Sequence, residues 1–155
     1  MSPGSEISTL ELFLRLGLAA LLGYLIGLER QFRGQPAGDR THALAALGAA
    51  AYTLLSLYAF PGSDPSRVAA QVVVGLGFLA AGVVIRDTSQ GMIHGLTTAA
   101  GIWAVGAMGL AIGVGWYAFG LLVAALIFLI LVAERLLHID ERITRWRTRI
   151  DDNLK

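Results

Sequence analysis

RVAAQVVVGLGFLAAGVVIRDTSQGMIHGLTTAAGIWAVGAMG, residues 67–109, contains two long apolar runs separated by a short polar segment. Its residues 68–85 carry no charge, and they approach the ~20 apolar residues with which a helix crosses the ~30 Å hydrocarbon core of a bilayer. A polar segment at 86–94 interrupts the apolar run, and the uncharged stretch that follows, 95–133, is far too long for one crossing. This pattern predicts a membrane protein with several spanning helices.

The composition agrees with a membrane protein. Of the 155 residues, 55% are hydrophobic and only 15% are charged, against about a quarter in soluble domains. The chain contains no cysteine, which excludes disulfides, thiolate metal ligands and a cysteine nucleophile. Glu11 and Arg15 lie where a cleaved signal peptide would be purely apolar, so we expect the first apolar segment to stay as a span. Their i,i+4 spacing also predicts that the two side chains pair.

Turn residues divide the chain into five expected spans. Glycine and proline mark the loops RGQPAGD at 33–39, FPGSDP at 60–65 and GVG at 113–115. The fold class is therefore all-α, a polytopic membrane protein with one transmembrane domain over 1–136. Its five transmembrane helices are expected at about 7–28, 41–60, 68–85, 96–112 and 116–136.

The remaining segment, 137–155, is expected to form a basic amphipathic helix on the cytoplasmic side. Apolar residues recur there at spacings of three and four, with arginines on the other face. Such a helix can lie on the anionic leaflet of the membrane, or it can pair with a second copy as a short coiled coil. Because Asp and Glu are interleaved with the arginines, we expect no nucleic-acid partner. The expected partners are lipid, a second copy in a homo-oligomer such as a dimer, and another membrane complex.

The distribution of basic residues predicts the orientation of the chain in its membrane. With five spans and the N-terminus outside, ten of the twelve Lys and Arg lie in cytoplasmic segments, and only Arg15 and Arg67 fall on the outer side. The opposite orientation would invert this ratio. The positive-inside rule therefore predicts an outer N-terminus and a cytoplasmic C-terminus.

Polar residues collect at two levels. At the cytoplasmic ends of the spans they could anchor the protein at the interface and cap helices, or hold an anion at the helix start near residue 95. On the outer side, Asp64 is expected to cap the third span, and Gln71 lies one turn inside it and needs a polar partner. The cytoplasmic-face cluster is Glu29, Arg30, Arg33, Arg40, Thr41, His42, Arg86, Thr97 and Thr98, and the outer-face set is Asp64, Arg67 and Gln71.

Small residues recur at four-residue spacing in the spans. In lipid, close backbone approach across small residues supplies much of the packing between helices. The alternative is that the glycines of the third span leave room for a permeating ion or a broken helix. The positions assigned to packing or to a pathway are Gly23, Gly27, Gly75, Gly77, Gly82, Gly95 and Trp103.

The sequence offers few oxygen ligands for a metal ion. Magnesium is bound through oxygen atoms and keeps much of its water shell. The oxygen donors near the spans are Asp64 and Gln71 outside, with Glu29 and Asp87 inside, and no carboxylate lies in mid-membrane. Asp64 and Glu29 are only weak metal candidates, and no cofactor is expected. The chain has no nucleotide fingerprint, nucleophile elbow or catalytic histidine pair, so we expect no enzymatic activity.

Five ordered motifs together resemble the bacterial MgtC/SapB family. They cover nearly everything from residue 15 to 135, and the sequence departs from the family pattern at Asp39, Ala80 and His94. Longer family members add a cytoplasmic C-terminal domain, which this chain is expected to lack. The motifs are GLER at 27–30, AGDRTH at 37–42, DPSR at 64–67 followed by Gln71, GLGFL at 75–79 through Gly82, and GLTTAA at 95–100 with Trp103.

The resemblance implies an inner-membrane protein linked to growth at low magnesium and, in pathogens, to virulence through survival inside macrophages. It also implies Mg²⁺ as a substrate or a signal rather than as a cofactor. Members of the family are described as magnesium-transport accessories and as regulators of other membrane complexes, including the ATP synthase. The shortage of membrane carboxylates favours a regulator that acts by helix contacts with itself or with another membrane complex.

Two other hypotheses are compatible with the sequence. One is a transporter or channel for magnesium or another small solute, with a path between the third and fourth spans near Gln71, Gly75, Gly77 and Thr97. The other is a lipid- or anion-sensing module that uses Arg30, Arg33, Arg40 and Arg86.

Overall fold

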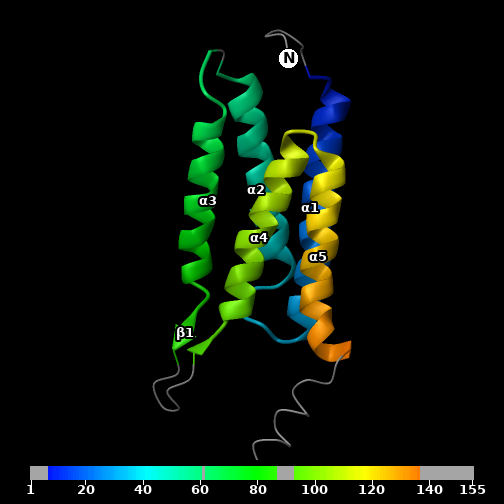
Figure 1. The fold of residues 1–155 in the computed structure, drawn as a ribbon, viewed down its shortest axis with the longest axis vertical. Coiled ribbons are helices and arrows are strands. Elements are labelled where there is room, and N and C mark those ends of the chain that lie inside the picture. Colours follow the sequence, from blue (N-terminus) through cyan, green and yellow to red (C-terminus); the bar gives the residue numbers. More distant parts are fainter. Residues whose placement is uncertain (1–6, 61, 87–92, 137–155) are drawn as a thin grey trace, which may run out of the picture.

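Five helices that alternate in direction make up the bundle in the computed structural model, which describes residues 7–60, 62–86 and 93–136 (Figure 1). An all-α fold with five helices is therefore confirmed. The segment 137–155, predicted to be an amphipathic helix, lies outside the described residues. The elements are α1 (Thr9–Phe32), α2 (Asp39–Tyr58), α3 (Ser66–Ala81), α4 (Leu96–Gly113) and α5 (Tyr117–Leu136), with two short strands, β1 (Ile85–Arg86) and β2 (Ile93–His94).

Two of these helices, α1 and α4, are long and apolar enough to cross a membrane, and Ser66–Ala81 and Tyr117–Ala133 are shorter apolar helices. The α1 helix continues past the predicted end of its apolar segment, because Glu29 and Arg30 take part in the helix rather than in the loop. Helix α3, by contrast, ends before the predicted boundary at 85.

Helix α4 is the centre of the bundle and contacts each of the other four helices. More than half of its residues are buried, among them Ile102, Val105 and Met108. A helix that is apolar on every side is expected to be surrounded by other elements, and the alanine- and glycine-rich sequence of α4 fits that rule. Glycine and alanine also let its neighbours come close.

Glycines bring α1, α2 and α4 into close contact. A Cβ atom at Gly23 of α1 would lie 2.6 Å from the carbonyl oxygen of His42, and one at Gly27 would lie 2.6 Å from that of Gly38. At Gly109 of α4 a Cβ would lie 2.5 Å from the carbonyl oxygen of Ala46. No side chain fits at these positions, so the three helices pack backbone against backbone.

Helix α3 lies at the edge of the bundle and is buried at only two residues, Leu76 and Ala80. Leu76 reaches the α4 backbone at Gly106, where a Cβ would lie 2.1 Å from Leu76 Cδ1. On its other faces α3 leaves large apolar residues exposed, with Val74 at 66% and Phe78 at 81%. One side of α3 is therefore docked and the rest is open.

A small antiparallel hairpin, β1 with β2, connects α3 to α4, where the sequence predicted only a polar loop. The helix ends with Gly82 at the C-cap position, and the β-branched run that follows favours extended backbone. In the hairpin Ile85 pairs with His94, and Arg86 pairs with Ile93.

Gly95 turns the chain from the hairpin into α4. Its φ is 87°, in the left-handed region that favours glycine. A Cβ there would also lie 2.5 Å from the carbonyl oxygen of Val83. Only glycine meets both conditions without strain.

The predicted pair of Glu11 and Arg15 is confirmed, with Arg15 Nε 2.8 Å from Glu11 Oε1. Arg15 also donates through Nη1 to the carbonyl oxygen of Gly113 at 2.9 Å, which caps the end of α4. The hydroxyl of Tyr117 donates to Glu11. This network ties α1, α4 and α5 together at one end of the bundle.

Candidate functional site

The predicted cytoplasmic-face cluster separates into a buried part and an exposed part. Arg30 is 3% exposed, and His42 and Thr98 are fully buried. Thr41, Arg40 and Thr97 are exposed instead, and Arg86 takes part in the hairpin through its backbone. The structure therefore brings together only some of the residues that the sequence grouped.

Glu29 holds two of the predicted arginines at the C-terminal end of α1. Its carboxylate lies 2.5 Å from Arg30 Nε and 2.5 Å from Arg33 Nε. Arg33 also donates through Nη2 to the carbonyl oxygen of Leu131 on α5, at 3.2 Å. Because both oxygens of Glu29 face guanidinium groups, this carboxylate is a poor candidate for a metal ligand.

His42, a residue of α2, is enclosed by α1 and α4. Its Nδ1 lies 2.8 Å from the carbonyl oxygen of Gly38, and because a carbonyl oxygen only accepts, Nδ1 is the donor. Within the described chain, His42 Nε2 and Arg30 Nη2 have no hydrogen-bond partner.

Thr98 connects the start of α4 to the loop between α1 and α2. Its hydroxyl donates to Gln35 Oε1 at 3.2 Å, and the Gln35 backbone N–H donates to the carbonyl oxygen of Arg30 at 3.1 Å. The sequence did not single out Gln35, because a neutral amide in a polar loop carries no distinctive pattern. These contacts are those of a structural cluster that locks three helices at one end.

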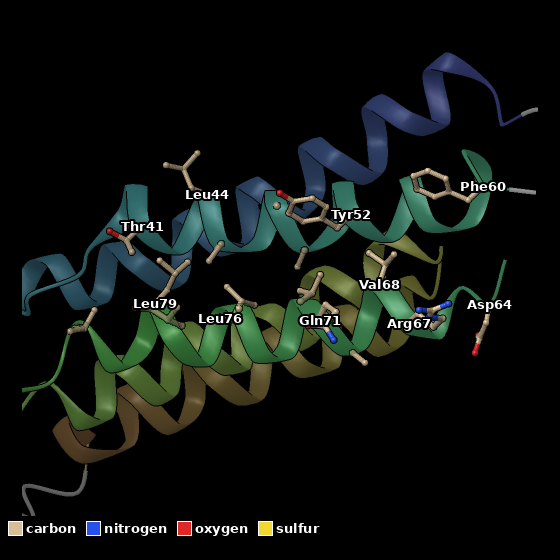
Figure 2. Close-up of a pocket in the computed structure, with 18 of the residues that line it drawn as sticks. Thr41, Leu44, Tyr52, Phe60, Asp64, Arg67, Val68, Gln71, Leu76 and Leu79 are labelled. Atoms are coloured by element: carbon tan, nitrogen blue, oxygen red, sulfur yellow. The ribbon is translucent and has the colours of Figure 1, made fainter.

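A groove of about 1340 Å³ runs between α2 and α3 over most of their length (Figure 2). Arg40 and Thr41 lie at one end, and Asp64 and Arg67 lie at the other. Between these ends the walls are largely apolar, with Leu79 near the first end. The groove joins members of the cytoplasmic-face cluster to the whole outer-face set of the sequence prediction.

Two glycines leave the middle of the groove open. Both Gly48 of α2 and Gly75 of α3 line it, and a Cβ on either would have no heavy atom within 4 Å. Nearby, Tyr52 on α2 and Gln71 on α3 lie at about the same level on the two walls (Figure 2). Neither side chain has a hydrogen-bond partner among residues 7–60, 62–86 and 93–136. Sequence reasoning missed Gly48 and Tyr52, because a pattern of small and aromatic residues does not say which helix they face.

Asp64 accepts a hydrogen bond from the backbone N–H of Ser66, the first residue of α3, at 2.9 Å. Asp64 therefore satisfies a donor at the helix start, but the cap position is occupied by Pro65 and not by Asp64 as predicted. The backbone and hydroxyl hydrogen bonds from Ser66, with a smaller contribution from Arg67, hold the pKa of the Asp64 carboxyl below its usual range. At neutral pH this end of the groove carries one negative and one positive charge.

Other predicted positions lie away from the groove. Gly77 faces open space, Gly82 ends α3, and Trp103 is exposed on α4. The predicted path between the third and fourth spans is filled where Leu76 meets Gly106, and Thr97 does not line the groove. Gln71 and Gly75 instead share a groove with α2.

The described residues contain no group of three or more His, Asp or Glu side chains that could hold a metal ion. The two weak candidates from the sequence are far apart, since Asp64 precedes α3 at one end of the bundle and Glu29 lies near the end of α1 at the other.

These features define the class of protein as an all-α bundle with membrane-type apolar helices. The chain belongs to the MgtC family, whose model matches residues 16–139. The resemblance stated from the motifs is thus confirmed.

Three relatives illustrate the similarity. The putative magnesium transporter YhiD of Escherichia coli K12 is 45% identical over 132 residues, which are 79% of this chain and 60% of YhiD. Protein SapB of Bacillus subtilis is 38% identical over 80% of this chain and 56% of SapB. Protein MgtC of Salmonella typhimurium is 48% identical over 67% of this chain and 44% of MgtC. The chain thus spans about half the length of these relatives, and no solved structure matches it.

Proposed function

We propose that the chain is a five-span inner-membrane protein that acts in magnesium homeostasis, without catalysis, by contact between α3 and a helix of a second copy or of another membrane complex. The observation that carries the proposal is the exposed face of α3 around Gly77 and Ala81. The N-terminus lies outside and the C-terminus is cytoplasmic in this proposal, following the distribution of basic residues.

Gly77 and Ala81 form a pair of small residues one helical turn apart, and neither is buried in the bundle. A Cβ at Gly77 would meet no heavy atom within 4 Å. The equivalent small residues of α1 and α4 are packed against neighbouring backbone, whereas this pair is free for an outside helix. Val74 and Phe78 flank it with apolar surface. Small residues that allow close backbone approach are the usual contact sites between helices in lipid.

The link to magnesium is supported by family membership and by the name of one relative. YhiD of E. coli is described as a putative magnesium transporter, and it shares 45% of its aligned residues with this chain. The chain covers only part of that relative, so we extend magnesium homeostasis to it as part of this proposal.

Growth at low magnesium tests the proposal. The gene is expressed in a bacterial strain that lacks its own MgtC-family protein and grows poorly at low Mg²⁺. We expect the unchanged chain and Gly17→Leu to restore growth, because Gly17 is a second exposed glycine with no heavy atom within 4 Å of its Cβ position. Gly77→Leu, at equal protein level, should fail to restore it. Equal growth with both variants would contradict the proposed contact face.

Crosslinking tests the contact itself. The chain has no cysteine, so a single Ala81→Cys residue can be crosslinked in membranes without a background. We expect a crosslinked second copy or one defined membrane protein from Ala81→Cys, and none from Leu122→Cys, an exposed position on α5. Crosslinking that is equal at both positions would argue against a specific face.

A second candidate function, transport, is favoured by the groove between α2 and α3. It connects polar residues near both ends of the bundle, and Thr41, Gln71 and Asp64 offer oxygen atoms along it. Flux of Mg²⁺ into proteoliposomes that contain the purified protein, lost in Gly75→Leu, would support transport. An absence of flux at protein densities where a known magnesium channel conducts would count against it.

A further inference from the structure

The groove between α2 and α3 changes in chemistry stepwise along its length. At one mouth lie the opposite charges of Asp64 and Arg67, and Gln71 follows four residues later, about 6 Å deeper along the helix (Figure 2). Beyond Gln71 the lining becomes apolar. The order from the mouth inward is therefore charge, neutral hydrogen-bonding group, and hydrocarbon.

The two charges at the mouth are not joined in a salt bridge. Among the described residues the salt bridges are those of Glu11 and Glu29, so Asp64 and Arg67 make none. Asp64 bonds to the backbone at Ser66, and both side chains are exposed. An anionic group can therefore bind to Arg67 while a cationic group of the same ligand binds to Asp64.

One turn deeper, the groove presents hydrogen-bond donors. Tyr52 contributes a hydroxyl and Gln71 contributes an amide, and in the described chain neither has a partner. At the depth of a bilayer an unsatisfied polar group is costly, so a ligand with acceptor oxygens at this level is favoured. The ester carbonyls of a glycerophospholipid are such acceptors.

The deeper part of the groove fits a hydrocarbon chain. Gly48 and Gly75 leave its centre open, and Leu44 and Leu79 continue the apolar lining toward the other end. Its volume of about 1340 Å³ exceeds the ~300–1,000 Å³ of typical small-molecule pockets. A long, flexible apolar ligand fills such a space better than a compact solute does.

We propose that this groove binds one phospholipid with an amino headgroup, such as phosphatidylethanolamine. Its phosphate lies at Arg67, its ammonium at Asp64, its ester carbonyls at Gln71 and Tyr52, and an acyl chain along Gly48 and Gly75. The inference rests on the proposed insertion of the bundle in a membrane and adds a ligand to it. It requires no particular orientation, because the lipid belongs to whichever leaflet surrounds the Asp64 end.

Native mass spectrometry of the purified full chain tests the proposal. The protein in detergent is mixed with equal amounts of phosphatidylethanolamine and phosphatidylglycerol that carry the same acyl chains. We expect one retained lipid per chain, predominantly phosphatidylethanolamine. Retention of neither lipid, or of both in equal amount, would overturn the proposal.

Two glycine variants test the place of the acyl chain. Gly75→Leu fills the groove, whereas Gly77→Leu adds the same side chain to α3 outside it. We expect lipid retention to fall about tenfold in Gly75→Leu, which corresponds to ~1.4 kcal/mol, and to stay unchanged in Gly77→Leu. Equal retention in the two variants would show that the lipid binds elsewhere.

Two charge variants test the headgroup. Arg67→Gln should lower the retention of both lipids, because each has a phosphate. Asp64→Asn should lower that of phosphatidylethanolamine alone and so remove the preference between the two. Arg40→Gln, at the opposite end of the same groove, is the matched control and should change neither. A loss caused by Arg40→Gln and not by Arg67→Gln would contradict the assigned end.

A fluorescence measurement keeps the test independent of the folding of Gly75→Leu. In Leu79→Trp, in the apolar part of the groove, phosphatidylethanolamine with brominated acyl chains should quench the added tryptophan more than it quenches the one in Tyr24→Trp on α1. Equal quenching would refute an acyl chain bound in the groove. A protein dimer that dissociates in Gly75→Leu would also refute it, because a second copy would then occupy the groove. The two proposals fail separately, since low-magnesium growth depends on Gly77 and lipid retention depends on Gly75.

Discussion

Thr98 and His42 are fully buried polar residues at the end of the bundle where α1, α2 and α4 meet. Each satisfies part of its hydrogen-bonding capacity through the first loop, Thr98 with Gln35 and His42 with Gly38. A buried polar group stabilises a fold only when it is paired, because its desolvation is otherwise uncompensated. These two residues therefore hold helices together through buried hydrogen bonds and do not form a binding surface.

Thr98→Val should lower the stability of the protein by about 1 kcal/mol, because the substitution keeps the shape of the side chain and leaves Gln35 Oε1 unpaired. Thr97→Val is the matched control, since Thr97 is exposed one residue earlier, and it should leave the stability unchanged. Thermal unfolding of both variants in the same detergent measures the difference. Equal melting temperatures would show that the Thr98 hydrogen bond contributes nothing.

Gly95→Ala should destabilise the protein by about 1–2 kcal/mol or more, from the left-handed backbone alone. A methyl group would in addition collide with the carbonyl of Val83. In Gly34→Ala the φ of 63° imposes a similar backbone cost, but open space surrounds the position. We expect a clearly larger drop in melting temperature for Gly95→Ala, and a drop no larger than that of Gly34→Ala would contradict the close contact.

The helices of the bundle differ in packing: α1, α2 and α4 are tightly packed, and α3 is loosely attached. Close glycine contacts hold α1, α2 and α4 together, whereas α3 is buried at two residues only. The sequence has small residues at four-residue spacing in all of these helices. In some helices these small residues are packed against another helix and in α3 they are exposed, because the helices differ in how many neighbours surround them.

Gly23→Leu tests the tight contact between α1 and α2. A side chain there would meet the backbone of His42, which cannot move aside as a flexible side chain can. Overpacking of this kind costs about 1–3 kcal/mol or more. We expect a lower melting temperature and less monodisperse protein on size-exclusion chromatography, while Gly17→Leu behaves like the unchanged chain. Normal elution and stability of Gly23→Leu would refute the contact.

The helices were predictable from the sequence because the length of an uncharged stretch and the positions of Gly and Pro are local properties. The pairing of Glu11 with Arg15 was predictable for the same reason. The hairpin around Arg86 was not, since two-residue strands depend on pairing across a loop. The groove was missed because glycine spacing in α3 does not tell which face meets α2 and which meets α4.

In the bundle as a whole, the connections between helices fall into two pairs, one pair at each end. The α1–α2 loop and the hairpin lie at the end where α5 finishes, and the α2–α3 and α4–α5 turns lie at the end where α1 begins (Figure 1). This arrangement agrees with an antiparallel bundle, and it places the arginine-rich loops on one side. Which side faces the cytoplasm is a prediction from charge.

Single-cysteine labelling tests that orientation in cells. Phe32→Cys, at the α1–α2 end, should react with a membrane-impermeant thiol reagent only after the cells are opened. Ser63→Cys and Trp116→Cys, at the other end, should react in intact cells. All three positions are exposed in the structure. Labelling of Phe32→Cys in intact cells, with protection of the other two, would reverse the predicted orientation.

The contact of Leu76 with Gly106 has a consequence for the neighbouring groove. Leu76 lines the groove with one side of its chain and meets the bare backbone of α4 with the other. A methyl group at position 106 would lie 2.1 Å from Leu76 Cδ1, so the end of this leucine side chain would have to turn aside. The missing side chain on α4 therefore decides how one residue of the groove wall is seated.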